Sequence, residues 1–307
     1  MKTEVIPIQQ KDGYRTRLFF YSASSDAVQG SILLLHGMAE HHGRYLEFIQ
    51  RLTLEGFDVY AYDHRGHGTD KALTELGYFA PKGGAALVIS DAIQICNYIK
   101  ENGRSKKLGL FGHSMGAIIV QCLMQQYPDF TCAVVSSTTA PPAVLSGFGV
   151  LLGNLLCLLQ GAKKQSPFLH KLMFGGKLYS ELCTRTTFDW LTRNNTIVGK
   201  YIDDPYCGFV CTTSFYRDLI SLTKKSTTKR CIKKIRKNLP IAFLTGTKDP
   251  VGGYAKGVIN LHKLYEKLGF TNLSLSIYED ARHELLNEFC VEEVTTELVT
   301  FFHNHFN

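Results

Sequence analysis

One stretch decides the fold: Leu108-Gly109-Leu110-Phe111-Gly112-His113-Ser114-Met115-Gly116-Ala117-Ile118-Ile119-Val120. An apolar run leads into residues 112–116 and a second leads out, which predicts a buried strand, a sharp turn and a helix. Gly112 and Gly116 supply the small residues needed where strand and helix nearly touch. The turn holds Ser114 in a strained backbone conformation at a helix N-terminus, where N–H groups favour developing negative charge. Ser114 is therefore the candidate nucleophile.

Strand-like and helix-like segments alternate on both sides of this stretch. Such alternation predicts a parallel sheet covered by helices on both faces. Between residues 138 and 222 the pattern is helical and irregular, which predicts an inserted helical cap on a core formed by residues 1–137 and 223–307. The strands are expected at 16–22, 31–36, 57–62, 107–112, 131–136, 241–245 and 273–278, and the core helices at 45–55, 85–101, 114–127, 257–268 and 291–302.

A serine hydroxyl needs a neighbouring base, and this type of turn places its partners in the chain order Ser, Asp, His. His283 follows the last expected strand and precedes the final helix, so we expect it to be the base. Asp249 follows the strand at 241–245 and would hold the imidazole. An Asp before Pro is also a common turn former.

Other residues remain as alternatives. Asp203 and Asp204 are possible acids, although both lie in the expected cap. His113 is adjacent to Ser114, and we expect neighbours on a sharp turn to point apart. His303 and His305 are expected at the surface, and His170 and His262 have no motif around them.

Stabilising an oxyanion requires hydrogen-bond donors near the nucleophile. The backbone N–H of Met115 is one candidate, and that of Met38, in the loop after the strand at 31–36, is the second. That loop and the one at 63–68 are rich in histidine and resemble a metal cluster. We interpret both as loops that shape the site, and we predict no metal. The residues concerned are His36, His41, His42, Asp63, His64 and His67.

The net charge of +7 comes from one segment. Without its eight basic residues the chain would carry about −1. A solvated helix face is one interpretation. The other is contact with an anionic membrane surface or anionic substrates. Nucleic-acid binding is not expected, because the segment lacks interleaved aromatic residues. The eight are Lys224, Lys225, Lys229, Arg230, Lys233, Lys234, Arg236 and Lys237.

Nine scattered cysteines without a Cys-x-x-Cys pair predict reduced thiols rather than a zinc site or a disulfide framework. The polar first thirteen residues show no secretory signal, so a cytoplasmic location is expected. The apolar stretch at 143–159 is interrupted by Ser146, Asn154 and three glycines. We predict a buried or lid helix there rather than a membrane span.

With these residues placed, the chain resembles the monoacylglycerol lipases and bacterial lysophospholipases of the α/β-hydrolase superfamily. The resemblance covers nearly the whole chain, although Thr69 stands where many relatives have Ser. It is carried by residues 36–45, 63–68, 112–116 and 246–250, by Arg282-His283-Glu284 with Asn287-Glu288, and in the cap by 188–191 and 204–209.

This resemblance implies an α/β-hydrolase fold: a mostly parallel eight-stranded sheet, helices on both faces and a mobile cap. It also implies ester hydrolysis on a single-chain lipid without a cofactor. Ser114, Asp249 and His283 carry over as the catalytic residues because each lies in a matching motif. Phe148, Phe168 and Phe174 would either line an acyl-chain site or pack the cap on the core. Thioesterase, amidase or acyltransferase activity, or a non-catalytic ligand-binding fold, remain as alternatives.

Overall fold

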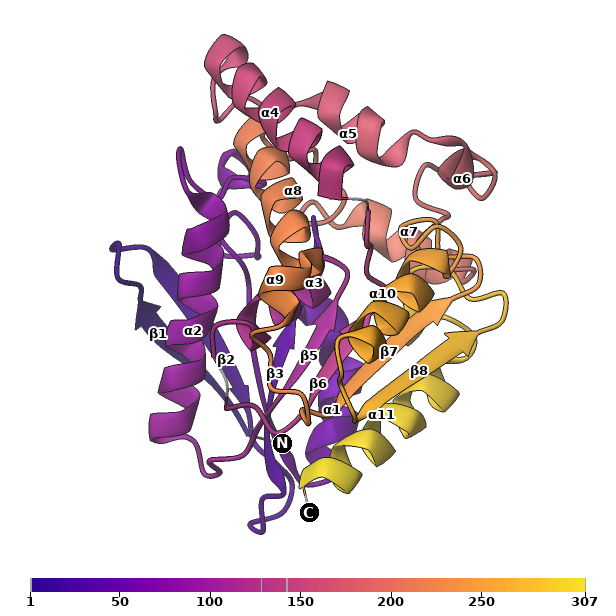
Figure 1. The fold of residues 1–307 in the computed structure, drawn as a ribbon. Coiled ribbons are helices and arrows are strands. Elements are labelled where there is room, and N and C mark those ends of the chain that lie inside the picture. The colour runs from indigo at the N-terminus through magenta and orange to yellow at the C-terminus, as the bar shows by residue number, and fades with distance from the viewer. Residues whose placement is uncertain (1, 128, 142, 307) are drawn as a thin grey trace.

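The structure is a computed structural model that describes residues 2–127, 129–141 and 143–306. Its centre is an eight-stranded sheet with the order β1-β2-β4-β3-β5-β6-β7-β8 (Figure 1). All pairs from β4 to β8 are parallel, whereas β1 and β2 are antiparallel to their neighbours. This confirms the predicted fold class. The strands are β1 Thr3–Gln9, β2 Arg15–Tyr21, β3 Gly30–Leu35, β4 Phe57–Tyr62, β5 Leu108–His113, β6 Ala133–Ser136, β7 Ile241–Gly246 and β8 Leu273–Tyr278.

Helices cover both faces of this sheet, and each layer has its own apolar core. One core contains side chains of α2 (Gly84–Asn102), α3 (Met115–Met124), α8 (Thr213–Thr227) and α10 (Lys256–Lys267). The other contains side chains of α1 (Leu46–Leu54) and α11 (Val291–Phe306). Strands β3, β4, β5, β6 and β7 are buried along their whole length. Their continuous apolar runs are what burial on both faces requires.

Two features of the core differ from the expectation. Strand β1 was not expected, because its side chains are mostly exposed and it is held as an edge strand by backbone pairing with β2. The segment at 45–55 is divided into a short 3-10 turn, η1 (His42–Tyr45), and α1. The other expected core strands and helices are present with boundaries shifted by a few residues.

Between β6 and β7 the chain leaves the sheet and forms α4 (Ala143–Gln160), α5 (Pro167–Phe174), α6 (Lys177–Ser180), α7 (Asn195–Asp203) and α8, followed after α8 by α9 (Lys229–Ile232). Figure 1 shows α4 to α7 above the carboxyl ends of the strands. Helix α8 packs against α4 but also against α3 and α2, and it continues to Thr227. It therefore joins the cap to the helices on one face of the sheet. The division of the chain at residues 138 and 222 remains a proposal.

Helix α4 carries large apolar side chains on its outer face, including Leu145, Phe148, Leu151 and Leu158. In the described part of the chain, no helix combines the length and the apolar character needed to cross a membrane. The helix expected at 143–159 is present as α4, with an exposed apolar face instead of full burial. All nine cysteines are free, and five of them are buried, as expected for reduced core thiols.

Candidate active site

Ser114 lies on a strained turn between β5 and α3, with φ 54° and ψ −114°. Few non-glycine residues adopt a positive φ, so the surrounding structure must hold it there. A Cβ at Gly112 would lie 2.5 Å from the carbonyl oxygen of Gly116, and a Cβ at Gly116 would collide with the carbonyl of Leu35. The sequence requirement for two glycines around Ser114 thus has a direct steric cause.

His283 and Asp249 are brought together from different loops. The Nδ1 of His283 lies 3.0 Å from Oδ1 of Asp249, which also accepts the backbone N–H of Val251 at 2.9 Å. Because a carboxylate only accepts hydrogen bonds, Nδ1 carries the proton and Nε2 is left as an acceptor. Burial disfavours a charged imidazole, but the charge and hydrogen bond of Asp249 outweigh it and raise the pKa of His283.

Ser114 and His283 line one cavity of about 230 Å³ beneath the cap. Among the residues that the structure describes, no hydrogen bond joins the Ser114 hydroxyl to the imidazole. Such bonds are often long without substrate and tighten in the complex. Asp203 is exposed and Asp204 pairs with His41, so neither takes the place of Asp249 beside His283.

Two backbone N–H groups in the loop after β3 donate hydrogen bonds to side chains. Gly37 donates to Glu40 Oε1 at 2.5 Å, and Ala39 donates to His67 Nε2 at 3.1 Å. Within the described residues, the N–H groups of Met38 and Met115 make no hydrogen bond. Met38 lines the cavity, and Met115 is buried directly after Ser114. Both predicted donors are therefore free to bind an oxyanion.

Three buried histidines of the two loops, His36, His64 and His67, bond to the backbone, whereas His42 Nδ1 bonds to the carboxylate of Asp63 at 3.0 Å. His36 Nδ1 donates to the carbonyl of Gly37 at 2.7 Å, and its Nε2 accepts the N–H of His64 at 3.1 Å. His67 Nδ1 donates to the carbonyl of Arg65 at 2.9 Å. Burial lowers the pKa of His64 to about 3 and that of His67 to about 4, so both rings are neutral at physiological pH. These bonds support the interpretation that the histidines shape the loops.

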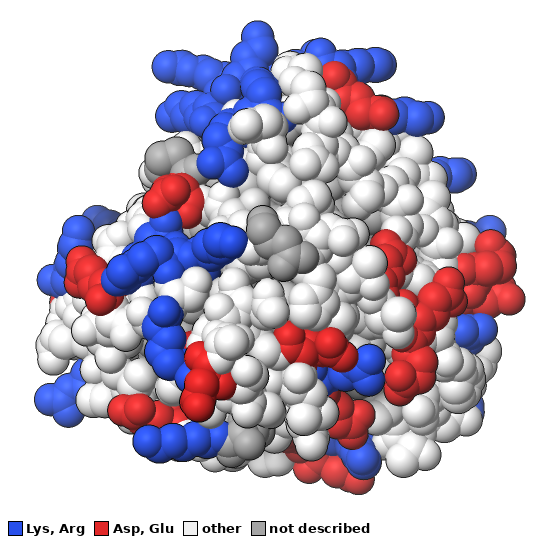
Figure 2. All heavy atoms as spheres, turned by 90° about the horizontal axis from the view of Figure 1, so that it is seen from below, with Lys and Arg blue, Asp and Glu red and all other residues white. Residues whose placement is uncertain are grey.

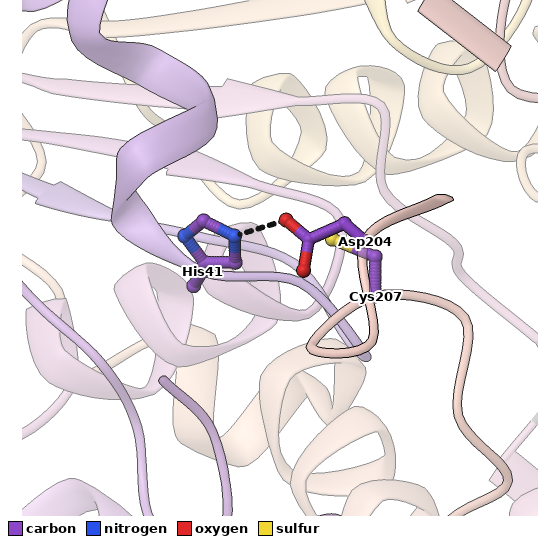
Figure 3. A group of neighbouring side chains, drawn as sticks. All are labelled: His41, Asp204 and Cys207. Atoms are coloured by element: carbon purple, nitrogen blue, oxygen red, sulfur yellow. Dashed lines mark hydrogen bonds and ion pairs between the residues drawn. The ribbon is translucent and has the colours of Figure 1, made fainter. Parts of the chain in front are cut away.

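Figure 3 shows a separate group, His41, Asp204 and Cys207, whose polar atoms lie within 4.8 Å of one another. His41 Nδ1 accepts the N–H of Gly43 at 3.2 Å, so Nε2 carries the proton and donates to Asp204 at 2.8 Å. Burial raises the pKa of Cys207 and keeps its thiol protonated. This chemistry favours a hydrogen-bonded link between the cap and the loop of Met38 over a metal site.

Sequence reasoning missed several residues that contact His283. The ring of His113 lies 4.7 Å from that of His283, a contact that the sequence did not indicate. His113 is the last residue of β5 and lines the same cavity as His283. The cap supplies Trp190, whose ring lies 5.2 Å from the imidazole, and the carbonyl of Leu191, which accepts the N–H of Glu284 at 2.7 Å. No local motif indicates contacts so distant in sequence.

The walls of the cavity are mostly apolar and come largely from the cap. Of the three phenylalanines singled out in the sequence, Phe174 lines the cavity. Phe148 and Phe168 point outward and are 68% and 59% exposed, so the expectation that they line or pack the cap is wrong. The remaining cap walls include Phe188, Trp190, Leu191, Tyr201 and Phe209, with His170, Lys171 and Thr187 as polar residues.

The sheet, the strained serine and the Asp–His pair define the α/β-hydrolase class of protein. The chain belongs to the family described as serine aminopeptidase, S33, whose model matches residues 26–289. It is 27% identical to a monoacylglycerol lipase of Mycolicibacterium smegmatis, covering 89% of each chain. It is 26% identical to a monoglyceride lipase of Rattus norvegicus, covering 91% of this chain and 82% of the relative.

The fold is similar to that of a thermostable carboxyl esterase from Bacillus coagulans, solved in complex with glycerol. The TM-score is 0.91 with 21% identity, and both chains are covered completely. At this identity the likeness concerns the fold.

Proposed function

We propose that this protein hydrolyses carboxylic esters of single-chain lipids, monoacylglycerols or lysophospholipids, through Ser114, His283 and Asp249. One observation carries the proposal: the acceptor nitrogen of an Asp-bound imidazole and a strained serine share a cavity with mostly apolar walls. The apolar walls suit an acyl chain, since burying such a chain is favourable. The relatives named as monoacylglycerol and monoglyceride lipases support the same substrate class.

In the proposed mechanism, His283 Nε2 takes the proton of Ser114 as the hydroxyl attacks the ester carbonyl. The oxyanion is bound by the N–H groups of Met38 and Met115. The C–O bond then breaks, and His283 donates the proton to the departing alcohol, which leaves an acyl-enzyme. Water repeats the sequence, giving up a proton to His283 and releasing the fatty acid. Each step balances without a cofactor.

Labelling with a fluorophosphonate probe tests the nucleophile. We expect the wild type to label and Ser114→Ala not to label, because the probe forms a bond to an activated serine. Failure of the wild type to label, or equal labelling of Ser114→Ala, would reject the catalytic proposal in favour of a ligand-binding fold. Circular dichroism of both proteins serves as the folding control.

A substrate panel tests the bond that is cleaved. The set should contain monoacylglycerols and lysophospholipids of several chain lengths, matched thioesters, and an aminoacyl amide, which the family description suggests. We expect kcat/KM to be highest for the acyl esters. A higher kcat/KM for the thioester or the amide would mean that the same catalytic residues cleave a different type of bond. Ester transfer to an added alcohol instead of water would indicate an acyltransferase.

We also propose that the basic segment contacts anionic lipid surfaces. Six of its side chains are exposed, and among the described residues none of the eight pairs with an acid. Figure 2 shows Lys and Arg side chains gathered at one edge of the lower face. Two members have structural contacts as well: Lys237 lies 4.0 Å from the ring centre of Phe270, and Arg236 donates to the carbonyl of Phe130.

Vesicle flotation tests this contact. We expect the wild type to bind vesicles containing phosphatidylserine at low salt and to be released as salt rises. Replacing Lys229, Lys233 and Lys234 by Glu should abolish binding, whereas the same change at three exposed lysines elsewhere, Lys2, Lys82 and Lys177, should reduce it less. No binding by the wild type, or equal loss in both triple variants, would contradict the proposal.

A further inference from the structure

A buried arginine joins the two loops that carry the candidate oxyanion donor and the candidate base. The Nη1 of Arg44 donates to Glu40 Oε2 at 2.6 Å and to Glu284 Oε1 at 2.6 Å, and its Nη2 donates to Glu284 Oε2 at 2.7 Å. The three side chains are at most 11% exposed. Bidentate ion pairs between arginine and a carboxylate are both strong and directional.

Each of the two carboxylates also accepts hydrogen bonds from residues of its own loop. Glu40 Oε1 accepts the N–H of Gly37 and the hydroxyl of Tyr45, at 2.5 and 2.8 Å, and so closes the turn that presents Met38. Glu284 directly follows His283, and its Oε2 also accepts the side-chain amide of Asn287 at 2.9 Å. A displacement of the Arg44 side chain would therefore displace both loops.

The cap covers this group of charges. The guanidinium carbon of Arg44 lies 4.7 Å from the ring centre of Tyr201 on α7. The hydroxyl of Tyr201 donates to the carbonyl of Ala39 at 2.9 Å, within the loop of Met38. The aromatic ring shields the ion pairs from water, and a low local dielectric strengthens charge interactions.

We propose that Arg44 is a positioning residue that fixes the distance between the oxyanion loop and His283, and that Glu284 and Glu40 set the charge which His283 experiences. This inference rests on the proposed function of Ser114, His283 and Asp249. It adds a role for three buried charged residues outside the proposed triad, two of which, Glu40 and Glu284, line the cavity.

The charged groups around His283 have opposite effects on its pKa. Asp249, Glu284 and Glu40 favour the imidazolium and raise the pKa of His283 against the effect of burial. His113, whose ring packs on His283, is neutral because burial and the charge of His283 lower its pKa far below the usual value. Arg44 offsets part of the carboxylate charge. Although burial acts to raise the pKa of Glu284, the charge and hydrogen bonds of Arg44 lower it. Removing one carboxylate charge should therefore make His283 less basic.

Two variants and one matched control test the proposal. Arg44→Lys keeps the charge but cannot bond to two carboxylates as the planar guanidinium does. We expect its kcat for an ester substrate to fall about 10- to 100-fold with KM nearly unchanged, because small displacements of catalytic groups have effects of this size. Glu284→Gln, which is nearly isosteric, should move the acidic limb of the pH profile of kcat/KM to lower pH.

The control is Arg65→Lys. Arg65 is also buried between two carboxylates, Asp12 and Asp91, but neither of these lines the cavity, whereas Glu40 and Glu284 do. Its pH profile should match that of the wild type. Unchanged kcat in Arg44→Lys would overturn the positioning role, and an unshifted limb in Glu284→Gln would overturn the electrostatic role. Should Arg44→Lys fail to fold, Glu284→Gln decides. An unreactive wild type would instead refute the proposed function.

Discussion

His283 Nδ1 lies 3.0 Å from Asp249 Oδ1, and both side chains are almost fully buried. The other carboxylate oxygen of Asp249 is buried without a hydrogen-bond partner among the described residues. Besides accepting the backbone N–H of Val251, the carboxylate holds the imidazole in the tautomer with Nε2 free.

Asp249→Asn should lower kcat for ester hydrolysis by about 10⁴-fold, because an amide can hold the ring in the wrong tautomer without changing its position. Steady-state kinetics with a chromogenic ester would measure this. Asp280→Asn is the control, since Asp280 lies in the neighbouring exposed turn. A loss smaller than tenfold in Asp249→Asn would reject Asp249 as the partner of His283.

The pH profile of the wild type should show an acidic limb above the usual histidine value of about 6.5. The sign follows from the role of His283: the base acts only when neutral, and its pKa is raised. Activity should therefore fall as the pH decreases through this raised pKa. Measuring kcat/KM between pH 5 and 9 would test this, and a limb midpoint below about 6 would contradict it.

Gly116→Ala should destabilise the fold, because the added Cβ meets the backbone of β3, which cannot move away easily. We expect a loss of about 1–3 kcal/mol or more in the free energy of unfolding, the size typical of overpacked cores. Gly199→Ala is the matched control: it lies in α7, where a Cβ meets nothing within 4 Å. It should be neutral or stabilising by about 0.5–1 kcal/mol.

Urea denaturation of the three proteins would measure these differences. Equal stability of Gly116→Ala and the wild type would show that the close approach of α3 and β3 is not required for folding.

The predictable parts of the fold were those with a strong local pattern. Strands such as β3 and β7 are buried on both faces, so their apolar runs are continuous and easily recognised. Strand β1 has mostly exposed side chains and is defined by pairing with β2, which local pattern does not reveal. The positions of Ser114, Asp249 and His283 followed from motifs placed at strand ends.

The surroundings of the candidate site were not predictable in the same way. Contacts such as Trp190 with His283, or Tyr201 with Ala39, join residues far apart in the chain. They depend on how the segment between β6 and β7 is placed over the sheet, and its periodicity does not specify that placement. The outward orientation of Phe148 and Phe168 has the same origin.

Tyr201→Phe should lower kcat modestly, because it removes one of two hydrogen bonds that the cap donates to the carbonyl of Ala39. The other, from the N–H of Gly208 at 2.9 Å, would remain. Ala39 has a φ of 53°, so the neighbouring peptide of Met38 depends on such support to keep its orientation. The ring over Arg44 is retained in the variant.

We expect a fall in kcat of about 2- to 12-fold, which corresponds to the net worth of one hydrogen bond, about 0.5–1.5 kcal/mol. KM should stay nearly constant if the effect lies in oxyanion binding in the transition state. Tyr206→Phe is the control, because Tyr206 lies on the adjoining loop and its hydroxyl makes no hydrogen bond within the described residues. If both variants retain the wild-type kcat, the cap does not support the oxyanion loop through Tyr201.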